Sequence, residues 1–136
     1  GWFSHEDPFE FDIHHFASAA DALRFWGGTP SVLPFTVARR SIETIADIGV
    51  NDIRRHNAAL SNRLVAGLGD LAVSPQDAAC RSGTVVVDPG AATGRVLDRL
   101  AAAHISVDHR PSGIRLSPHI YTTDADIDRT VDVVLG

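Results

Sequence analysis

The stretch that decides the fold is Gly113–Asp128, which reads Gly-Ile-Arg-Leu-Ser-Pro-His-Ile-Tyr-Thr-Thr-Asp-Ala-Asp-Ile-Asp. At its start, apolar residues alternate with Arg115 and Ser117, which predicts a short strand that places these two polar side chains on one face. Pro118 ends the strand because proline has no N–H to donate. Thr123 then caps a helix whose first turns are acidic, as the helix dipole favours.

Arg115 is the candidate binding residue of this stretch. A guanidinium held on a strand beside a polar turn suits bidentate binding of a small carboxylate or phosphate. The alternative is a structural ion pair between Arg115 and a nearby aspartate. Spacing alone leaves both interpretations open.

Around this stretch, the pattern from residue 70 to the end predicts the order β–β–α–β–β–α. The fold class is therefore α+β (α/β), a small module whose helices cover one face of a sheet. The predicted strands are Leu71–Ser74, Gly83–Asp88, Ile105–His109 and Gly113–Ser117, and the predicted helices are Thr93–His104 and Thr123–Leu135.

Two long helices precede this module. The first begins at Pro30, a favoured opening residue, and is closed by Gly49. The second is capped by Asn51 or Asp52 and runs to Leu68. The apolar residues at helical spacing, expected to face inward, are Val32, Leu33, Phe35, Thr36, Ala38, Ile42, Ile45, Ala46 and Ile48 in the first helix, and Ile53, Ala59, Leu60, Leu64, Val65 and Leu68 in the second.

The first 30 residues are predicted to be mostly irregular, with a short strand near Phe9–Phe11 and helical character in Ala17–Phe25. The turn Gly27-Gly28-Thr29-Pro30 is rich in free amides and lies just before a helix, so it could bind an anion. Ordinary loop chemistry explains the same composition.

Composition excludes several classes of function. The formal net charge of -5 argues against a nucleic-acid-binding face. No apolar run reaches membrane-spanning length, so no membrane association is predicted. The single cysteine, Cys80, fits a reducing, cytoplasmic compartment and is expected to be a small buried hydrophobe.

Histidine and lysine usage bear on the chemistry. The His14-His15 pair has no second cluster at ligand spacing, so no metal site is predicted. All 12 basic residues other than histidine are arginine. A Schiff base on a lysine amine therefore cannot form within this chain alone.

Three motifs, taken in order, resemble one family. They are Gly-Trp-Phe-Ser-His at 1–5, Phe-Trp-Gly-Gly-Thr-Pro at 25–30 and Ile-Arg-Leu-Ser-Pro-His-Ile-Tyr-Thr-Thr at 114–123. Together they resemble the C-terminal portion of the class V aminotransferase family, which comprises fold-type-I pyridoxal-phosphate (PLP) enzymes. Kynureninase-like and selenocysteine lyase-like members are the most similar. Ser4 departs from the glycine that kynureninases often carry, which leaves the substrate open.

The resemblance implies a cofactor site shared across a homodimer. Trp2, Gly28 and Thr29 would contact the phosphate of pyridoxal 5'-phosphate bound to the neighbouring subunit. An indole N–H, a backbone amide and a hydroxyl are all suitable donors for phosphate. The Schiff-base lysine is expected upstream of Gly1, so no catalytic residue is assigned within this chain.

The resemblance also implies a substrate site for an amino acid. Arg115 would bind the α-carboxylate, His5 would lie close to the substrate, and Arg110 would support the site. The implied reactions are kynureninase-like hydrolysis, C–S or C–Se bond cleavage, and transamination. The alternative is a standalone, non-catalytic interaction or dimerisation module derived from such an enzyme.

The same resemblance suggests three segments. An irregular edge of the large cofactor domain is followed by two linking helices and then by the small domain. They are expected at 1–30, 31–69 and 70–136.

Overall fold

The structure is a computed structural model that describes residues 1–29 and 31–136. The chain divides into two compact units, Gly1–Asp47 and Ile48–Gly136, which are taken in turn below. The three-segment division at 1–30, 31–69 and 70–136 stays a prediction. Among the helices of the described residues, none has both the length and the hydropathy needed to cross a membrane.

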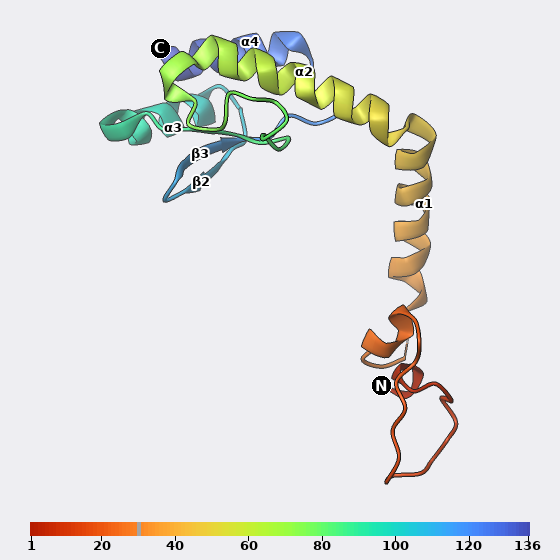
Figure 1. Ribbon diagram of the computed structural model, residues 1–136. Coiled ribbons are helices and arrows are strands. Elements are labelled where there is room, and N and C mark those ends of the chain that lie inside the picture. Colours follow the sequence, from red (N-terminus) through yellow and green to blue (C-terminus); the bar gives the residue numbers. More distant parts are fainter. Residues whose placement is uncertain (30) are drawn as a thin grey trace. The chain divides into compact units, whose positions relative to one another are not determined.

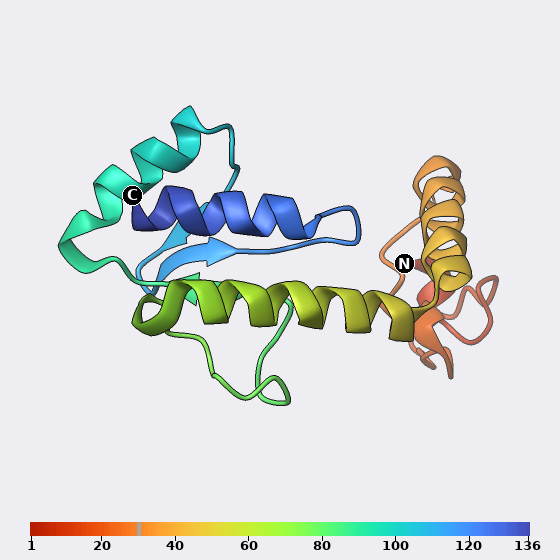
Figure 2. The same ribbon diagram turned by 90° about the horizontal axis from the view of Figure 1, so that it is seen from above.

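The second unit is built on a three-stranded antiparallel sheet of strand order β1-β3-β2 (Figure 1). Helices α2 and α4 lie side by side over this sheet, and α3 packs against α4 (Figure 2). The α+β class is therefore confirmed. The elements are α2 (Val50–Leu68), β1 (Val85–Val87), α3 (Thr93–Ala102), β2 (Asp108–Arg110), β3 (Gly113–Leu116) and α4 (Asp124–Leu135).

Strand β3 is the central strand, and its alternating sequence is reflected in its burial. Ile114 and Leu116 are buried in the core, while Arg115 between them is only partly covered on the other face. The strand begins at Gly113, whose φ of +125° is unfavourable for any residue with a side chain. A Cβ on Gly113 would also lie 2.5 Å from the carbonyl oxygen of Val87. Close pairing of β3 with β1 therefore requires glycine at this position.

The helix α4 begins as its sequence predicts. The Thr123 hydroxyl accepts a hydrogen bond from the Asp126 amide at 3.2 Å, and the Asp126 carboxylate accepts one from the Thr123 amide at 2.8 Å. This reciprocal capping box satisfies two backbone donors at the start of the helix. The hydrogen bond from the Thr123 backbone lowers the pKa of Asp126 below its usual value.

Helices α2 and α4 are held together by close packing and one ion pair. A Cβ on Gly67 would lie 2.9 Å from a Val131 methyl carbon, so glycine lets the helices approach. Arg63 binds Asp128 through two hydrogen bonds, Nε to Oδ1 at 2.5 Å and Nη2 to Oδ2 at 2.7 Å. The Arg63 hydrogen bond lowers the pKa of Asp128 below its usual value.

The core lies between these helices and the sheet. The buried residues form one apolar cluster, to which α2, α3 and α4 all contribute. Its buried members are Leu60, Leu64, Val65, Leu68, Ala72, Val85, Val87, Val96, Leu100, Ile114, Leu116, Ile127 and Val134.

Three predicted elements of this unit differ from the structure. The expected strand Leu71–Ser74 is reduced to a single bridge between Ala72 and Val87, because it lies at the sheet edge beside the very short β1. The expected strand Ile105–His109 pairs only from Asp108 onward, and it continues to Arg110. Helix α2 begins two or three residues early, with Gly49 at its N-cap in place of Asn51 or Asp52.

Several residues expected inward in this region also differ. Ile53 is only partly buried and Ala59 is exposed, whereas the last four residues of the predicted face are buried. The reason is that α2 is longer than the layer it covers. Only its C-terminal half packs on the sheet and on α4.

The first unit contains little regular structure. It has two 3-10 turns, Trp2–Ser4 and Ala22–Phe25, and the helix α1, Val32–Ile48. The expected helical character of Ala17–Phe25 is thus confined to one turn, which Asp21 caps through its side chain. The expected strand at Phe9–Phe11 is absent, and the pairing in this part of the chain is a bridge between His5 and Ser18. The predicted helix start at Pro30 lies outside the described residues.

The expectation that the apolar stripe of helix α1 faces inward is wrong. The structure leaves its apolar stripe exposed, including Val32, Leu33, Phe35 and Ile42. Its end at Gly49 agrees with the prediction. The spacing of the stripe is helical, but the described part of the first unit offers no sheet or helix layer to cover it.

Candidate functional site

Arg115 lies on the face of the sheet that is turned away from the core. It is paired with Val86 of β1 on one side and with Asp108 of β2 on the other. Its guanidinium Nη1 donates to Asp108 Oδ2 at 3.1 Å, and its side chain is 41% exposed. The group is therefore held by the strand and by one carboxylate, while much of its donor fork faces solvent.

Asp108 is shared between two arginines. The same oxygen, Oδ2, accepts a hydrogen bond from Arg110 Nε at 2.8 Å. The ion pair that the sequence left open for Arg115 thus exists, but its partner is the cross-strand residue of β2 and not an aspartate of α4. Two guanidinium groups and one carboxylate leave a net positive charge at this point of the sheet. Arg110 is thus linked to Arg115 through Asp108, and its supporting role stays a prediction.

The polar turn after β3 does not share a pocket with Arg115. Ser117, Tyr121 and Thr122 line a pocket of about 340 Å³ together with His104 and Arg129. That pocket is walled by Leu116, which lies on the core side of β3. Arg115 does not line that pocket, so most of the polar turn lies apart from the guanidinium although the two are close along the chain.

The Gly-Trp and Gly-Gly-Thr motifs meet in the first unit. A Cβ on Gly1 would lie 2.5 Å from the Trp26 carbonyl oxygen and 2.6 Å from the Gly28 nitrogen. The hydroxyl of the buried Ser4 donates to the same Trp26 carbonyl at 2.6 Å. Ser4, the residue that departs from the kynureninase pattern, therefore ties the two motifs together.

The predicted phosphate contacts are accessible. Trp2 is 66% exposed, with its ring edge-to-face on Phe11 at 6.3 Å between centroids. Thr29 is exposed, and no heavy atom lies within 4 Å of a Cβ built on Gly28. An indole N–H, an amide and a hydroxyl are thus all accessible in the first unit, and donors of these kinds fit a phosphate.

His5 is the buried member of the predicted site. It is 8% exposed, and both ring nitrogens contact backbone. Nε2 accepts a hydrogen bond from the Ala17 amide at 3.0 Å, and Nδ1 lies 2.8 Å from the Asp7 carbonyl oxygen. The Asp7 amide also lies within hydrogen-bond distance of Nδ1, at 3.0 Å, so each ring nitrogen faces a backbone N–H donor and the neutral ring can accept from either one.

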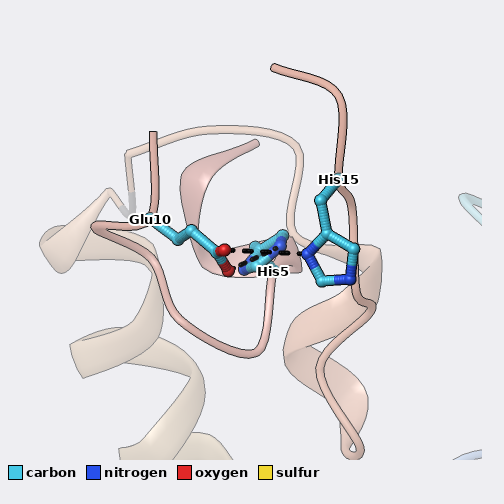
Figure 3. A group of neighbouring side chains, drawn as sticks. All are labelled: His5, Glu10 and His15. Carbon is cyan, nitrogen blue, oxygen red and sulfur yellow. Dashed lines mark ion pairs between the residues drawn. The ribbon is translucent and has the colours of Figure 1, made fainter. Parts of the chain in front are cut away.

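His5 also lines a small pocket of the first unit. This pocket has a volume of about 270 Å³, and Trp2, Glu10, His15 and Phe16 are among its other lining residues. Figure 3 shows His5, Glu10 and His15 pointing toward one another. The histidine pair at 14 and 15 was set aside in the sequence for want of further ligands, and His5 and Glu10 provide them in space.

Cys80 differs from its expected environment. It is exposed, and its thiol lies 3.7 Å from Asp77 Oδ2. Its neighbour Arg81 is the buried residue instead, donating to the carbonyls of Pro75 and Gln76 and to the Asn62 side chain. The loop between α2 and β1 therefore folds around an arginine, and the cysteine turns outward.

The predicted site residues lie in both units. Trp2, His5, Gly28 and Thr29 belong to the first unit, and Arg115 belongs to the second. Their assembly into one site stays a prediction. The sequence did not single out Asp108 and Glu10, and it considered His15 only within the His14-His15 pair. Strand pairing would have indicated Asp108.

No protein-family model matches the chain. Kynureninase from Bacillus cereus is 27% identical over 144 aligned residues, which cover 98% of this chain and 33% of that protein. The kynureninases of Bacillus anthracis and Shouchella clausii are 28% and 27% identical over the same coverage. The chain thus spans about a third of the length of the curated relatives it matches.

A solved structure has the same fold. The apo cysteine desulfurase from Thermococcus onnurineus NA1 superposes with a TM-score of 0.77 at 21% sequence identity, over 91% of this chain and 35% of that one. The helix-covered antiparallel sheet is thereby a fold that this chain shares with part of the cysteine desulfurase. Together with the kynureninase matches, this confirms the predicted resemblance to the C-terminal portion of class V aminotransferase-type enzymes.

Proposed function

We propose that the chain acts as the C-terminal part of a PLP-dependent enzyme whose substrate is an amino acid. The reaction would be a kynureninase-like hydrolysis, a C–S or C–Se cleavage, or a transamination. The observation that carries the proposal is the position of Arg115, a half-exposed guanidinium fixed on the open face of the central strand. The kynureninase similarity along nearly the whole chain supports it.

In this proposal Arg115 binds the α-carboxylate of the substrate. The planar guanidinium donates two parallel hydrogen bonds to a carboxylate, which fixes both the distance and the orientation of the amino acid. In the structure, Asp108 accepts one hydrogen bond from Arg115. When the substrate carboxylate replaces Asp108 on Arg115, Asp108 keeps its hydrogen bond from Arg110. His5 stays close to the substrate as a rigid wall, because both of its ring nitrogens contact backbone.

The cofactor contacts come from the first unit. Trp2, the Gly28 amide and the Thr29 hydroxyl would hold the phosphate of the PLP bound to the partner in a homodimer. When bound, PLP supplies an electron sink, and the protein supplies orientation and charge. The covalent link must come from a lysine elsewhere in the whole protein, because all 12 basic residues here other than histidine are arginine. A cytoplasmic location is part of the same proposal.

A non-catalytic interaction or dimerisation module is the second candidate. The exposed apolar stripe of α1 favours it, since a solvated helix rarely carries so many uncovered aliphatic and aromatic side chains. The two candidates differ in whether the whole protein turns over an amino acid.

The test uses the full-length protein and compares Arg115→Ala with Arg95→Ala. Arg95 is an exposed arginine of α3, so its replacement removes the same charge away from the site. Losing the carboxylate contact is expected to remove about 2–4 kcal/mol of binding, which raises KM for the amino acid about 30- to 900-fold. Kynurenine, cysteine and cysteine sulfinate are the substrates to screen. An unchanged KM in folded Arg115→Ala protein would show that Arg115 is not the carboxylate ligand.

A further inference from the structure

A loop of the first unit is closed at its base by strand-like pairing. His5 and Ser18 form an antiparallel bridge, flanked by hydrogen bonds from the Glu6 amide to the Ala17 carbonyl and from the Ala19 amide to the Ser4 carbonyl, both 2.9 Å. The segment between them folds back over this base. It brings Glu10 and His15 to the side of His5 (Figure 3).

The three side chains form a compact set of potential ligands. Glu10 Oε2 lies 3.7 Å from His5 Nε2, and Glu10 Oε1 lies 3.6 Å from His15 Nδ1. One ligand atom from each residue fits within 4.8 Å of the others. In tetrahedral coordination with bonds of about 2.0–2.2 Å, neighbouring ligand atoms lie about 3.3–3.6 Å apart. The two measured separations, each to a different oxygen of Glu10, are close to this range, so rotation of the side chains suffices to bring one oxygen and the two nitrogens around a metal.

One tautomer of His5 suits metal binding through Nε2. In that tautomer Nδ1–H donates to the Asp7 carbonyl at 2.8 Å, and Nε2, which lies 3.7 Å from Glu10 Oε2, is the acceptor. Metal-binding histidines are usually oriented in this way, by a carbonyl or carboxylate on the other ring nitrogen. The Ala17 amide at 3.0 Å now uses the Nε2 lone pair, so a metal would replace that one hydrogen bond.

We propose that His5 Nε2, a Glu10 carboxylate oxygen and His15 Nδ1 bind a divalent transition-metal ion, with Zn²⁺ as the best match to two imidazoles and one carboxylate. Three protein ligands leave a fourth position open, as in catalytic zinc sites. That position faces a pocket of about 270 Å³, whose aromatic walls include Trp2, Phe11 and Phe16. The site could therefore accept water or a small donor ligand beside the metal.

This site is independent of the proposed enzymatic function. Glu10 and His15 have no part in binding the amino acid or the cofactor phosphate. His5 is the one shared residue, so the variants that test the metal leave it unchanged. Glu10 and His15 are both exposed, and their replacement leaves the core of either unit intact.

The experiment measures Zn²⁺ binding by competition with a chromophoric chelator. The unmodified chain is compared with Glu10→Gln, His15→Ala and the matched control His14→Ala. His14 is the adjacent exposed histidine outside the cluster. We expect one Zn²⁺ per chain and a weakening of at least about 10- to 100-fold for Glu10→Gln and His15→Ala, since even residues that merely orient ligands have effects of that size. His14→Ala should bind like the unmodified chain.

A second readout concerns geometry and does not depend on any variant. Co²⁺ in a four-coordinate site gives intense visible absorption, whereas six-coordinate Co²⁺ absorbs weakly, so the unmodified chain should show the intense bands at one equivalent. Absence of stoichiometric binding would overturn the proposal. A loss of affinity in His14→Ala equal to that in His15→Ala would do the same, because it would indicate general histidine binding at the surface.

Discussion

The replacement of Gly113 by alanine offers the sharpest test of how the central strand is built. A side chain at a φ of +125° costs about 1–3 kcal/mol in backbone strain. The new Cβ would lie 2.5 Å from the Val87 carbonyl oxygen and 3.1 Å from a Val86 methyl, so β1 and β3 must separate locally, at about 1–3 kcal/mol. Alanine also lowers the conformational entropy of the unfolded chain, which offsets about 0.4–1 kcal/mol of this loss of stability. The net loss is about 2–4 kcal/mol.

The assay is urea unfolding followed by far-UV circular dichroism, because both tryptophans lie in the first unit and would not report on the sheet. With a slope of about 1–1.5 kcal/mol per M for a unit of this size, the midpoint should fall by about 1.3–4 M. The matched control is Gly94→Ala in α3, where a Cβ meets no atom within 4 Å. That variant should gain about 0.5–1 kcal/mol from helix propensity. If Gly113→Ala unfolds at the same urea concentration as the unmodified chain, the glycine is not required by the sheet.

Three further predictions concern α2, α4 and the loop before β1. The pKa of Asp128 is lowered in the folded state by its hydrogen bond from Arg63, so the unfolded chain binds a proton more readily. This contribution to stability is present above the usual aspartate pKa of about 3.9 and is lost as pH falls through the lower folded value. The stability difference between the unmodified chain and Asp128→Asn, measured by urea unfolding, should therefore hold from pH 7 to about pH 4 and shrink toward pH 2. A difference that grows on acidification would contradict the ion pair. Gly67→Ala should destabilise the chain by about 1–3 kcal/mol through contact with Val131, and adding Val131→Ala should remove most of that loss in a double-mutant cycle. Cys80 should react with a thiol reagent in the native chain at a rate near that of the urea-unfolded chain, because it is exposed, and strong protection would show that the loop buries it.

Local sequence signals predicted the parts of the fold that depend on neighbouring residues. The alternation around Arg115 fixes which face of β3 is buried, and the Thr123–Asp126 capping box fixes where α4 begins. Residues that depend on distant partners were harder to predict. The segment Leu71–Ser74 has the composition of a strand, but its pairing is limited by the short β1. Helix α1 has an amphipathic pattern, but periodicity cannot say which part of a protein covers it.

The candidate site shows the same division. The family motifs drew attention to Arg115 and to the first residues of the chain, but they did not reveal Asp108, because cross-strand partners depend on register. The expected burial of Cys80 failed because a loop can bury either of two adjacent residues, and here the buried one is Arg81 with its three oxygen partners. Glu10 and His15 become neighbours only through the closed loop.

The shared carboxylate of Asp108 has a consequence for selectivity. Asp108 is already bound to Arg115, so an incoming ligand must compete with this carboxylate for the guanidinium. A ligand with a single weak acceptor gains little from the exchange, whereas a carboxylate that engages both arms of the guanidinium gains one hydrogen bond. Because Arg110 retains Asp108 after the exchange, no charge is left unpaired. A bidentate carboxylate is therefore expected to compete with Asp108 for Arg115 better than a neutral molecule does.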